Sequence, residues 1–246
     1  MEKYDVIGDI HGCYEEMNDL LNELGYIQDG TQLSHPDDRI AVFLGDLTDR
    51  GPFSVKVARD VSRWVKQNNA LYCPGNHCDK LYRYLIGRNV MIKNGLETTV
   101  EELKHLSSNE FKRVSDSFIE LYEQAPLYLQ LDEDRLVVTH AGIRPDMIGK
   151  VSRQVKTFVL YGDITGETHE DGRPVRKDWA SNYSFDSFIT YGHTPVKKPR
   201  LIGETINIDT GCIFGGRLTA FRWPDKTLFS VPSKQPYIKE KFQSFD

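Results

Sequence analysis

The stretch IAVFLGDLTDRGP, residues 40–52, sets the pattern from which the fold of this chain can be predicted. The apolar run at 40–44 indicates a buried strand, and a loop rich in Gly and Asp follows it directly. The same order occurs twice more, since residues 3–7 lead into GDIHG and residues 71–73 lead into PGNH. A helix with an apolar stripe is expected after each loop, near 54–66 after the second and near 79–86 after the third. This alternation predicts an α/β fold with a largely parallel sheet, whose ligand sites lie beyond the carboxyl ends of the strands.

Composition limits the kind of protein. The 246 residues carry a formal charge of −5, which disfavours a nucleic-acid surface built on overall positive charge. The four cysteines are scattered, the amino terminus leads directly into a strand, and no apolar run approaches the roughly 20 residues that cross a bilayer. These features predict a cytoplasmic protein with reduced thiols.

The remaining segments are expected to add further helices, strands and loops to these three strand–loop–helix units. Residues 97–124 are helical and charged, which predicts an inserted helical segment at about 88–125 within one domain spanning 1–246. Two strands at 127–131 and 135–139 are expected to form a hairpin, followed by a helix at 151–160. Residues 162–182 read as a long polar loop of the kind that often lines binding sites. Short strands and turns fill the chain from residue 188 onward.

Five short loops place Asp, Asn or His beside Gly. Glycine lets the backbone turn sharply and lets a ligand approach without a Cβ in the way. One such loop can be an ordinary turn, whereas five in one chain favour a shared site. Carboxylate oxygens together with imidazole nitrogens suit manganese, iron, nickel or zinc. The residues are Asp9 and His11, Asp46 and Asp49, Asn76 and His77, His140, and His193.

These five loops, in this order, resemble the calcineurin-like metallophosphoesterase superfamily, in its branch of protein phosphatases and diadenosine tetraphosphatases. Residues 160–180, YGHTPV and NIDTGCIFGGRLTAFRW resemble more narrowly the bacterial PrpE family and the phosphatase module of bacterial polynucleotide kinase-phosphatases. The resemblance covers almost the whole chain. It implies the four-layer metallophosphatase sandwich, in which helices flank two mixed β-sheets and the active site lies at the carboxyl ends of the strands.

The resemblance also implies a centre of two divalent metal ions, manganese or nickel first, with iron or zinc as alternatives. Asp9, His11 and Asp46 would hold one ion. The second ion would be held by Asp46, which bridges, together with Asn76, His140 and His193. A hydroxide shared by two cations roughly 3.5 to 4 Å apart would attack phosphorus in line with the leaving oxygen.

Four further residues receive roles by the same resemblance. His77 would be the general acid that protonates the leaving group, and Asp49 would orient its ring. Arg50 would clamp phosphate through two hydrogen bonds. A second arginine is expected from the polar loop, and Arg176 is preferred to Arg173 because it stands in the GRPVR segment.

The implied activity is hydrolysis of a dinucleoside polyphosphate, with diadenosine tetraphosphate as the small-molecule nucleotide partner. A protein phosphatase acting on phosphotyrosine, phosphoserine or phosphothreonine and a nucleic-acid end phosphatase are alternatives that share the same centre. A non-catalytic scaffold with a phosphatase-like fold is the alternative of another class. No membrane partner is expected, and nucleic acid is the less favoured partner.

Cys78 departs from the resemblance, because an acidic residue usually follows GNH in the superfamily. We interpret it as a small residue at the start of a helix, with oxidation sensitivity as the minor alternative. Tyr161, Trp179 and Tyr191 could stack on a base, but aromatic side chains beside strands more often pack in the core.

Overall fold

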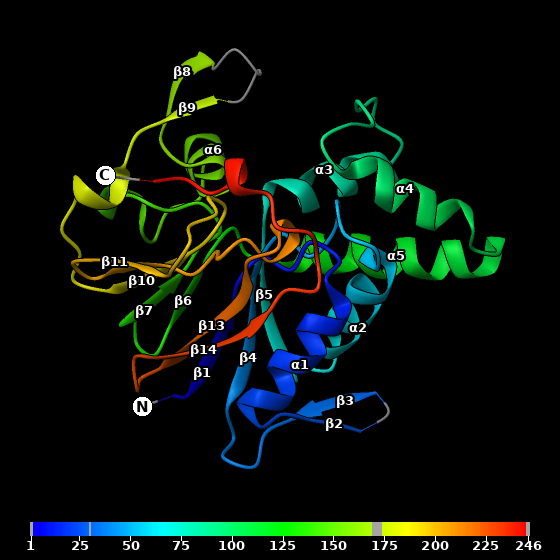
Figure 1. Ribbon diagram of the computed structural model, residues 1–246, viewed down its shortest axis with the longest axis horizontal. Coiled ribbons are helices and arrows are strands. Elements are labelled where there is room, and N and C mark those ends of the chain that lie inside the picture. The colour runs from blue at the N-terminus through cyan, green and yellow to red at the C-terminus, as the bar shows by residue number, and fades with distance from the viewer. Residues whose placement is uncertain (1, 30, 169–173, 245–246) are drawn as a thin grey trace.

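The computed structural model describes residues 2–29, 31–168 and 174–244. Within these residues, two five-stranded sheets lie at the centre of the molecule (Figure 1). The first sheet has the order β14-β13-β1-β4-β5, with bounds Thr227–Pro232, Arg217–Trp223, Tyr4–Ile7, Ile40–Gly45 and Ala70–Pro74. The second has the order β11-β12-β10-β7-β6, with bounds Arg200–Ile202, Thr205–Asn207, Phe188–Tyr191, Leu136–Val138 and Leu129–Leu131.

Parallel strands form the middle of each sheet. β1, β4 and β5 are parallel, with Tyr4 opposite Ile40 and Leu44 opposite Cys73. In the second sheet β10 is parallel to both β7 and β12. The remaining strands pair antiparallel, so both sheets are mixed, as the resemblance implied. The parallel register brings the carboxyl ends of β1, β4 and β5 to one edge of the first sheet.

Apolar side chains hold the layers together. Val6, Val42 and Leu44 point from the first sheet to Val138 and Phe188 of the second, and all are buried. Because alternate residues of a strand face opposite ways, Ile7 and Phe43 face instead the helices that cover the outer side of the first sheet. The strands of the first sheet therefore pack against the second sheet on one face and against helices on the other. The predicted sandwich of two sheets flanked by helices is confirmed.

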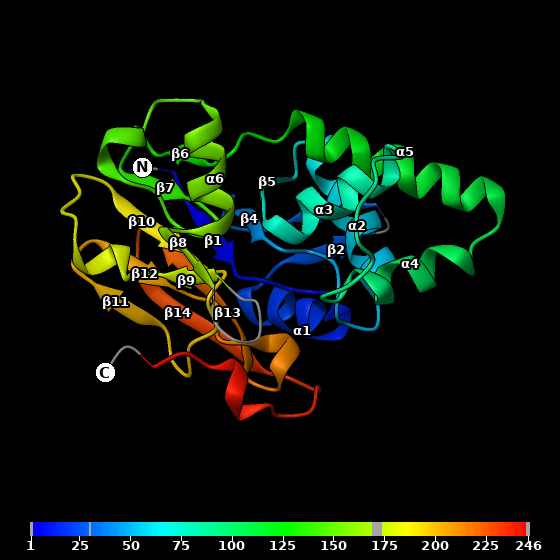
Figure 2. The same ribbon diagram turned by 90° about the horizontal axis from the view of Figure 1, so that it is seen from above.

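The helices cover both outer faces (Figures 1 and 2). α1, α2, α3 and α5 contribute buried side chains to the first sheet's outer core, whereas α6 packs on the second sheet. The bounds are Tyr14–Leu24 for α1, Ser54–Lys66 for α2, Asn76–Leu85 for α3, Leu96–Lys104 for α4, Ser108–Gln124 for α5 and Arg153–Tyr161 for α6. Short 3₁₀ turns occupy Pro145–Met147, Trp179–Ser181, Cys212–Phe214 and Lys239–Lys241.

Three details differ from expectation. α3 begins at Asn76 rather than near residue 79, because the GNH loop itself forms the first turn of the helix. The expected polar loop at 162–182 contains a small antiparallel sheet of β8, Ile164–Thr168, and β9, Pro174–Arg176. A second small sheet joins β2, Ile27–Asp29, to β3, Gln32–Ser34. These short strands are mostly exposed, so their sequences do not alternate between apolar and polar residues clearly enough to predict them.

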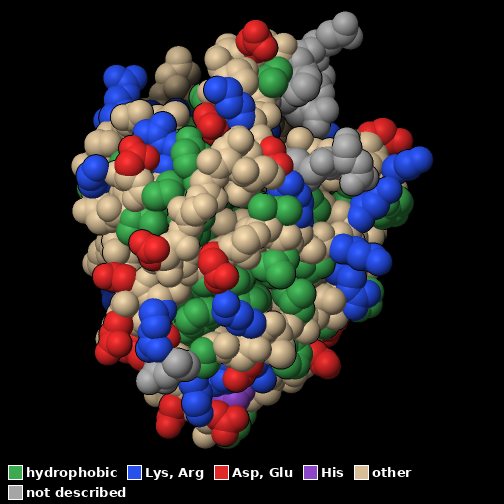
Figure 3. Space-filling view, turned by 90° about the vertical axis from the view of Figure 1, so that its left-hand side faces the viewer, with side chains coloured by type: hydrophobic (Ala, Val, Ile, Leu, Met, Phe, Trp, Pro, Cys, Tyr) green, Lys and Arg blue, Asp and Glu red, His purple; other side chains and the backbone are tan. Residues whose placement is uncertain are grey.

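The surface carries no broad region of one charge on the face that Figure 3 presents. Hydrophobic side chains gather in the middle of that face, with basic and acidic side chains around them. Among the described helices, none has the length and apolar character needed to cross a bilayer.

Candidate metal centre

All five polar loops converge at the carboxyl ends of parallel strands. Each loop leaves its strand at the same side of the molecule, so side chains distant in sequence meet above the two sheets. The loop after β1 supplies Asp9 and His11, the loop after β4 supplies Asp46, Asp49 and Arg50, the start of α3 supplies Asn76 and His77, and the loops after β7 and β10 supply His140 and His193.

Asp46 lies in the middle of this group. Its Oδ2 is 3.7 Å from Nε2 of His11 and 3.5 Å from Nε2 of His140. Its Oδ1 accepts a hydrogen bond of 2.8 Å from the backbone N–H of His77. The carboxylate is buried and faces imidazoles on two sides, which is the arrangement that a bridging ligand requires.

The other proposed ligands are close to Asp46. His140 Nε2 lies 3.0 Å from Oδ1 of Asn76 and 2.9 Å from Nδ1 of His193. Within the described chain, the ligand atoms of Asp46, His140 and His193 lie within 4.8 Å of one another, and a second such group joins His11, Asp46 and His77. The structure thus brings donor atoms together on both sides of the Asp46 carboxylate.

Asp9 connects three of the loops and belongs to neither of those two groups. Its Oδ1 accepts from the backbone N–H of Asp46 at 3.0 Å, and its Oδ2 accepts from that of His193 at 2.8 Å. The same Oδ1 lies 3.1 Å from Nδ1 of His140. Burial raises the pKa of Asp9, but the charge of His140 and the hydrogen bonds from His140, Asp46 and His193 together lower it below its usual value.

The donor set fits divalent transition-metal ions. Nε2 of His193 is buried without a hydrogen-bond partner among the described residues. A buried polar atom left in this way is costly unless something binds it. Burial, followed by the Arg50 charge, keeps the pKa of His11 well below its usual value. Burial and the His140 charge do the same to the pKa of His193, so both imidazoles are neutral and can ligate metal.

Backbone conformation explains why these loops contain glycine. A Cβ at Gly45, whose φ is +78°, would lie 2.1 Å from Nδ1 of His140, and a Cβ at Gly75 would lie 2.1 Å from Oδ1 of Asp46. His11 and His193 themselves adopt φ values of 48° and 70°. Side chains rarely tolerate this region, and such strain gathers at functional sites.

A second arrangement of charge lies beside the metal ligands. Nδ1 of His77 is 2.8 Å from Oδ2 of Asp49, and both side chains are buried. The other oxygen of Asp49 accepts a bond of 2.7 Å from the hydroxyl of Thr99, which belongs to α4. This contact fixes the orientation of the His77 ring and leaves its Nε2 without a partner in the Asp49 pair.

The two arginines expected to bind phosphate, Arg50 and Arg176, contact different parts of the centre. Arg50 Nη1 is 2.8 Å from Nε2 of His11, at the centre itself. Arg176 donates from Nε to the carbonyl oxygen of Tyr161 at 2.9 Å, and its charge helps to lower the pKa of His193. Arg173 lies outside the described residues.

Sequence reasoning missed Thr99 and Asp209. No local pattern marks Thr99, because its contact with Asp49 depends on how α4 packs against the loop after β4. Asp209 is buried beside Asp9, and burial together with the Asp9 charge raises its pKa to about 8. The NIDTGC run that contains Asp209 carries no local signal of its own beyond the resemblance.

The residues set aside from the centre lie in the core. Cys78 is fully buried within α3, and burial followed by the Asp46 charge raises the pKa of its thiol to about 12. Trp179 and Tyr191 pack beneath α6 with 5% of each residue exposed, which leaves no face for a base. Tyr161 is half-buried against the same cluster.

Two sheets with a buried cluster of carboxylates and imidazoles above them define a metallophosphoesterase. The chain belongs to the calcineurin-like phosphoesterase family, whose sequence pattern matches residues 3–230. It is 58% identical over 243 residues to a protein of Halalkalibacterium halodurans named bis(5'-nucleosyl)-tetraphosphatase PrpE [asymmetrical], and the match covers 99% of each chain.

Other relatives support the same family and fold. A protein of Geobacillus thermodenitrificans with the same name is 58% identical over 241 residues, which is 98% of each chain. A crystal structure described as a candidate diadenosine tetraphosphatase superposes with a TM-score of 0.66 over 94% of both chains. Its 24% sequence identity supports the fold alone.

Proposed function

We propose that this chain hydrolyses diadenosine tetraphosphate and related dinucleoside polyphosphates. The observation that carries the substrate is the 58% identity, along 99% of both chains, to a relative named for asymmetrical cleavage of such compounds. Asymmetrical cleavage of diadenosine tetraphosphate gives ATP and AMP, whereas symmetrical cleavage gives two molecules of ADP. The geometry of the centre supports the reaction, because it combines ligands for cations, a proton donor and cationic groups for phosphate.

Two divalent ions are the proposed cofactors, with manganese or nickel preferred and iron or zinc as alternatives. Asp9, His11 and Asp46 would hold one ion. The other would be held by Asp46, Asn76, His140 and His193. Bound there, the ions would supply a nucleophilic water and polarise the phosphoryl oxygens. The protein's own part is to hold neutral imidazoles and a shared carboxylate in place before the substrate arrives.

His77 is the proposed general acid. Because Asp49 accepts the Nδ1 proton, the ring keeps one orientation and presents Nε2 toward the centre. Arg50 and Arg176 are the proposed phosphate clamps, and each adds positive charge beside the metal ligands. Arg176 stays the preferred second clamp, and its effect on the pKa of His193 supports a place beside the centre.

We further propose that the chain forms one domain that works in the cytoplasm. The inserted segment at about 88–125 contributes buried residues of α4 and α5 to the core that α2 and α3 share. All four cysteines are buried and free, which suits a reducing compartment.

The test is a parallel comparison of kcat/KM, with manganese and with nickel, for three substrates: diadenosine tetraphosphate, a phosphotyrosine peptide and a 5'-phosphorylated oligonucleotide. We expect the dinucleotide to give the highest kcat/KM, with ATP and AMP as products by chromatography. A higher value for the peptide would make the chain a protein phosphatase, and a higher value for the oligonucleotide would make it a nucleic-acid end phosphatase. Absence of turnover on all three, in metal-loaded protein, would support a non-catalytic scaffold.

A further inference from the structure

Residues 233–244 form a C-terminal segment that is tied to the loops around the metal centre. The backbone N–H of Ile238 donates at 3.0 Å to the carbonyl oxygen of Phe214, in the 3₁₀ turn after β12. Farther along, the N–H of Gln243 donates at 2.8 Å to the carbonyl oxygen of Pro195, in the loop after β10. Figure 1 shows the segment in red at the upper side of the molecule. Hydrogen bonds therefore hold it at its middle and near its end.

Glycines in the run GCIFGG, residues 211–216, make room for this segment. A Cβ at Gly215, whose φ is +76°, would collide with the backbone of Tyr237. The Tyr237 ring stacks on that of Phe242, with the ring centroids 5.2 Å apart. Close packing of this kind fixes the turn between the two rings, Lys239–Lys241, against the loop.

Two cations lie against one aromatic ring where this segment meets the centre. Cζ of Arg50 is 5.4 Å from the centroid of the half-buried Phe214 ring, and Nζ of Lys241 is 5.6 Å from it. Arg50 also reaches the centre, because its Nη1 is 2.8 Å from Nε2 of His11. Among the described residues, no carboxylate forms an ion pair with Arg50 or Lys241. Like charges repel, so an anion that contacts both cations would be stabilised.

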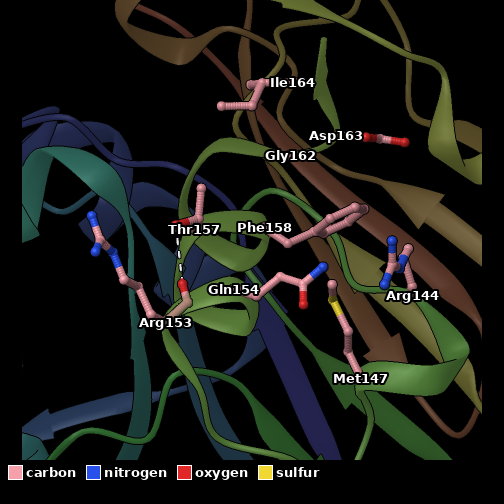
Figure 4. A pocket seen from close by; sticks show the side chains of 9 residues that line it. All are labelled: Arg144, Met147, Arg153, Gln154, Thr157, Phe158, Gly162, Asp163 and Ile164. Atoms are coloured by element: carbon pink, nitrogen blue, oxygen red, sulfur yellow. Dashed lines mark hydrogen bonds between the residues drawn. The ribbon is translucent and has the colours of Figure 1, made fainter. Parts of the chain in front are cut away.

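A cavity of about 490 Å³ along α6 offers no comparable pair of charges. Arg144 donates two hydrogen bonds of 3.0 Å to the carboxylate of Asp146 and covers the Phe158 ring. Figure 4 shows Arg153 on the opposite side of the helix, away from that ring. The cations without a carboxylate partner therefore lie beside Phe214.

We infer that Lys241 binds the phosphates of the substrate that follow the one under attack. The inference rests on the proposed function. The metals and Arg50 would hold the phosphoryl group that is cleaved, and the Phe214 ring leads from Arg50 to Lys241. The lysine ammonium is a compact charge on a flexible stem, which suits a phosphate chain that can bend. A dinucleoside tetraphosphate has further phosphates to offer, whereas a phosphate monoester has none, so Lys241 favours the longer substrate.

The first test compares two substrates in the metal-loaded protein. Lys241→Gln removes the charge and keeps most of the length of the side chain. It is expected to lower the ratio of kcat/KM for diadenosine tetraphosphate to kcat/KM for p-nitrophenyl phosphate about tenfold, the scale of one charge-assisted hydrogen bond. Lys241→Arg keeps the charge and should retain most of the ratio. Lys239→Gln is the matched control, since it removes an exposed cation of the same turn that does not lie over the Phe214 ring.

Two results of this comparison would overturn the inference. One is a ratio in Lys241→Gln equal to that in Lys239→Gln. The other is an equal fall in Lys241→Gln and Lys241→Arg, which would show that Lys241 only positions the segment.

A binding experiment separates this inference from the proposed function. The probe is bis(methylene)triphosphonate, a triphosphate analogue whose P–C–P bridges resist hydrolysis, titrated into the metal-loaded protein in a calorimeter. Its Kd is expected to rise about tenfold in Lys241→Gln and to stay unchanged in Lys239→Gln. That result without cleavage of the dinucleotide overturns the substrate but supports the phosphate site. Cleavage of the dinucleotide with an unchanged Kd in Lys241→Gln overturns the role of Lys241 but not the proposed function.

Discussion

Asp46 illustrates how one residue can serve two requirements at the centre. Its Oδ2 faces imidazoles on both sides, whereas its Oδ1 accepts the backbone N–H of His77. The same carboxylate therefore arranges the ligands and fixes the start of the helix that carries the proposed acid. Asparagine has nearly the same shape, but its neutral amide oxygen binds cations more weakly than a carboxylate oxygen.

Asp46→Asn is therefore expected to lose metal while it keeps its fold. Elemental analysis after dialysis should find less metal per protein molecule than in the unmodified protein. Circular dichroism should show the same helix content in both. Asp134→Asn, on the exposed turn between β6 and β7, is the control and should keep its metal. Full metal content in Asp46→Asn would remove this residue from the bridging position.

His77→Ala is expected to separate catalysis from metal binding. If His77 only donates a proton, both ions should stay bound while kcat falls by about 100-fold or more. The measurement is kcat together with metal content in the same sample. His105→Ala, which removes an exposed imidazole just after the end of α4, should change neither quantity. Loss of metal in His77→Ala would instead make it a ligand, which its closeness to His11 and Asp46 also allows.

At the scale of elements, α4 supports the catalytic loop from outside the sandwich. The Thr99 hydroxyl donates to Oδ1 of Asp49, while Oδ2 of the same carboxylate holds the His77 ring. The backbone N–H of Asp49 also lies 3.1 Å from the Thr99 hydroxyl oxygen. A helix from the inserted segment thereby fixes the carboxylate that contacts the proposed acid, His77.

Thr99→Val keeps the shape of the side chain but removes the hydroxyl. It is expected to lower kcat about two- to tenfold, the scale of one hydrogen bond, with KM and metal content unchanged. Thr99→Ser restores the hydroxyl and should recover most of the activity. Thr98→Val is the matched control, since its hydroxyl bonds only to the carbonyl of Gly95. A fall in stability with unchanged kcat would show that Thr99 only packs.

The sequence predicted those elements whose signal is local. The loops after β1, β4 and β5 each follow an apolar run, and the alternation of strands with helices predicts parallel strands, so the convergence of these loops could be inferred from the sequence. The contact between Thr99 and Asp49 could not be predicted, because the segment 88–125 contains several hydroxyl groups. Only the packing of α4 determines which of them reaches Asp49. β8 and β9 were also missed, since exposed residues such as Ile164 give no alternating pattern.

At the scale of the whole molecule, the centre lies across two sheets. His140 and His193 extend from the second sheet, whereas Asp9 and Asp46 extend from the first. Ions bound by both groups would connect the layers, and anything that binds only the folded state stabilises it. The order of strands within each sheet was not predicted, because pairing β1 with β13 depends on contacts more than 200 residues apart along the sequence.

Metal loading is therefore expected to raise the melting temperature. At a concentration 100 times its dissociation constant, a single ion contributes about 2.7 kcal/mol. The measurement is thermal unfolding with manganese, with nickel, and after treatment with a chelator. Asp46→Asn should show little of the rise. An equal melting temperature in loaded and stripped protein would argue against ions that join the two sheets.

The pairing of β1 with β13 has a consequence for how the protein is made. β1 is synthesised long before β13, yet β13, one of its two neighbours in the sheet, begins only at Arg217. Until that strand emerges, one edge of β1 has no hydrogen-bond partner, and the loop carrying Asp9 and His11 lacks its support. A chain cut before Arg217 is therefore expected to leave this edge of β1 open and to hold metal less firmly through Asp9 and His11.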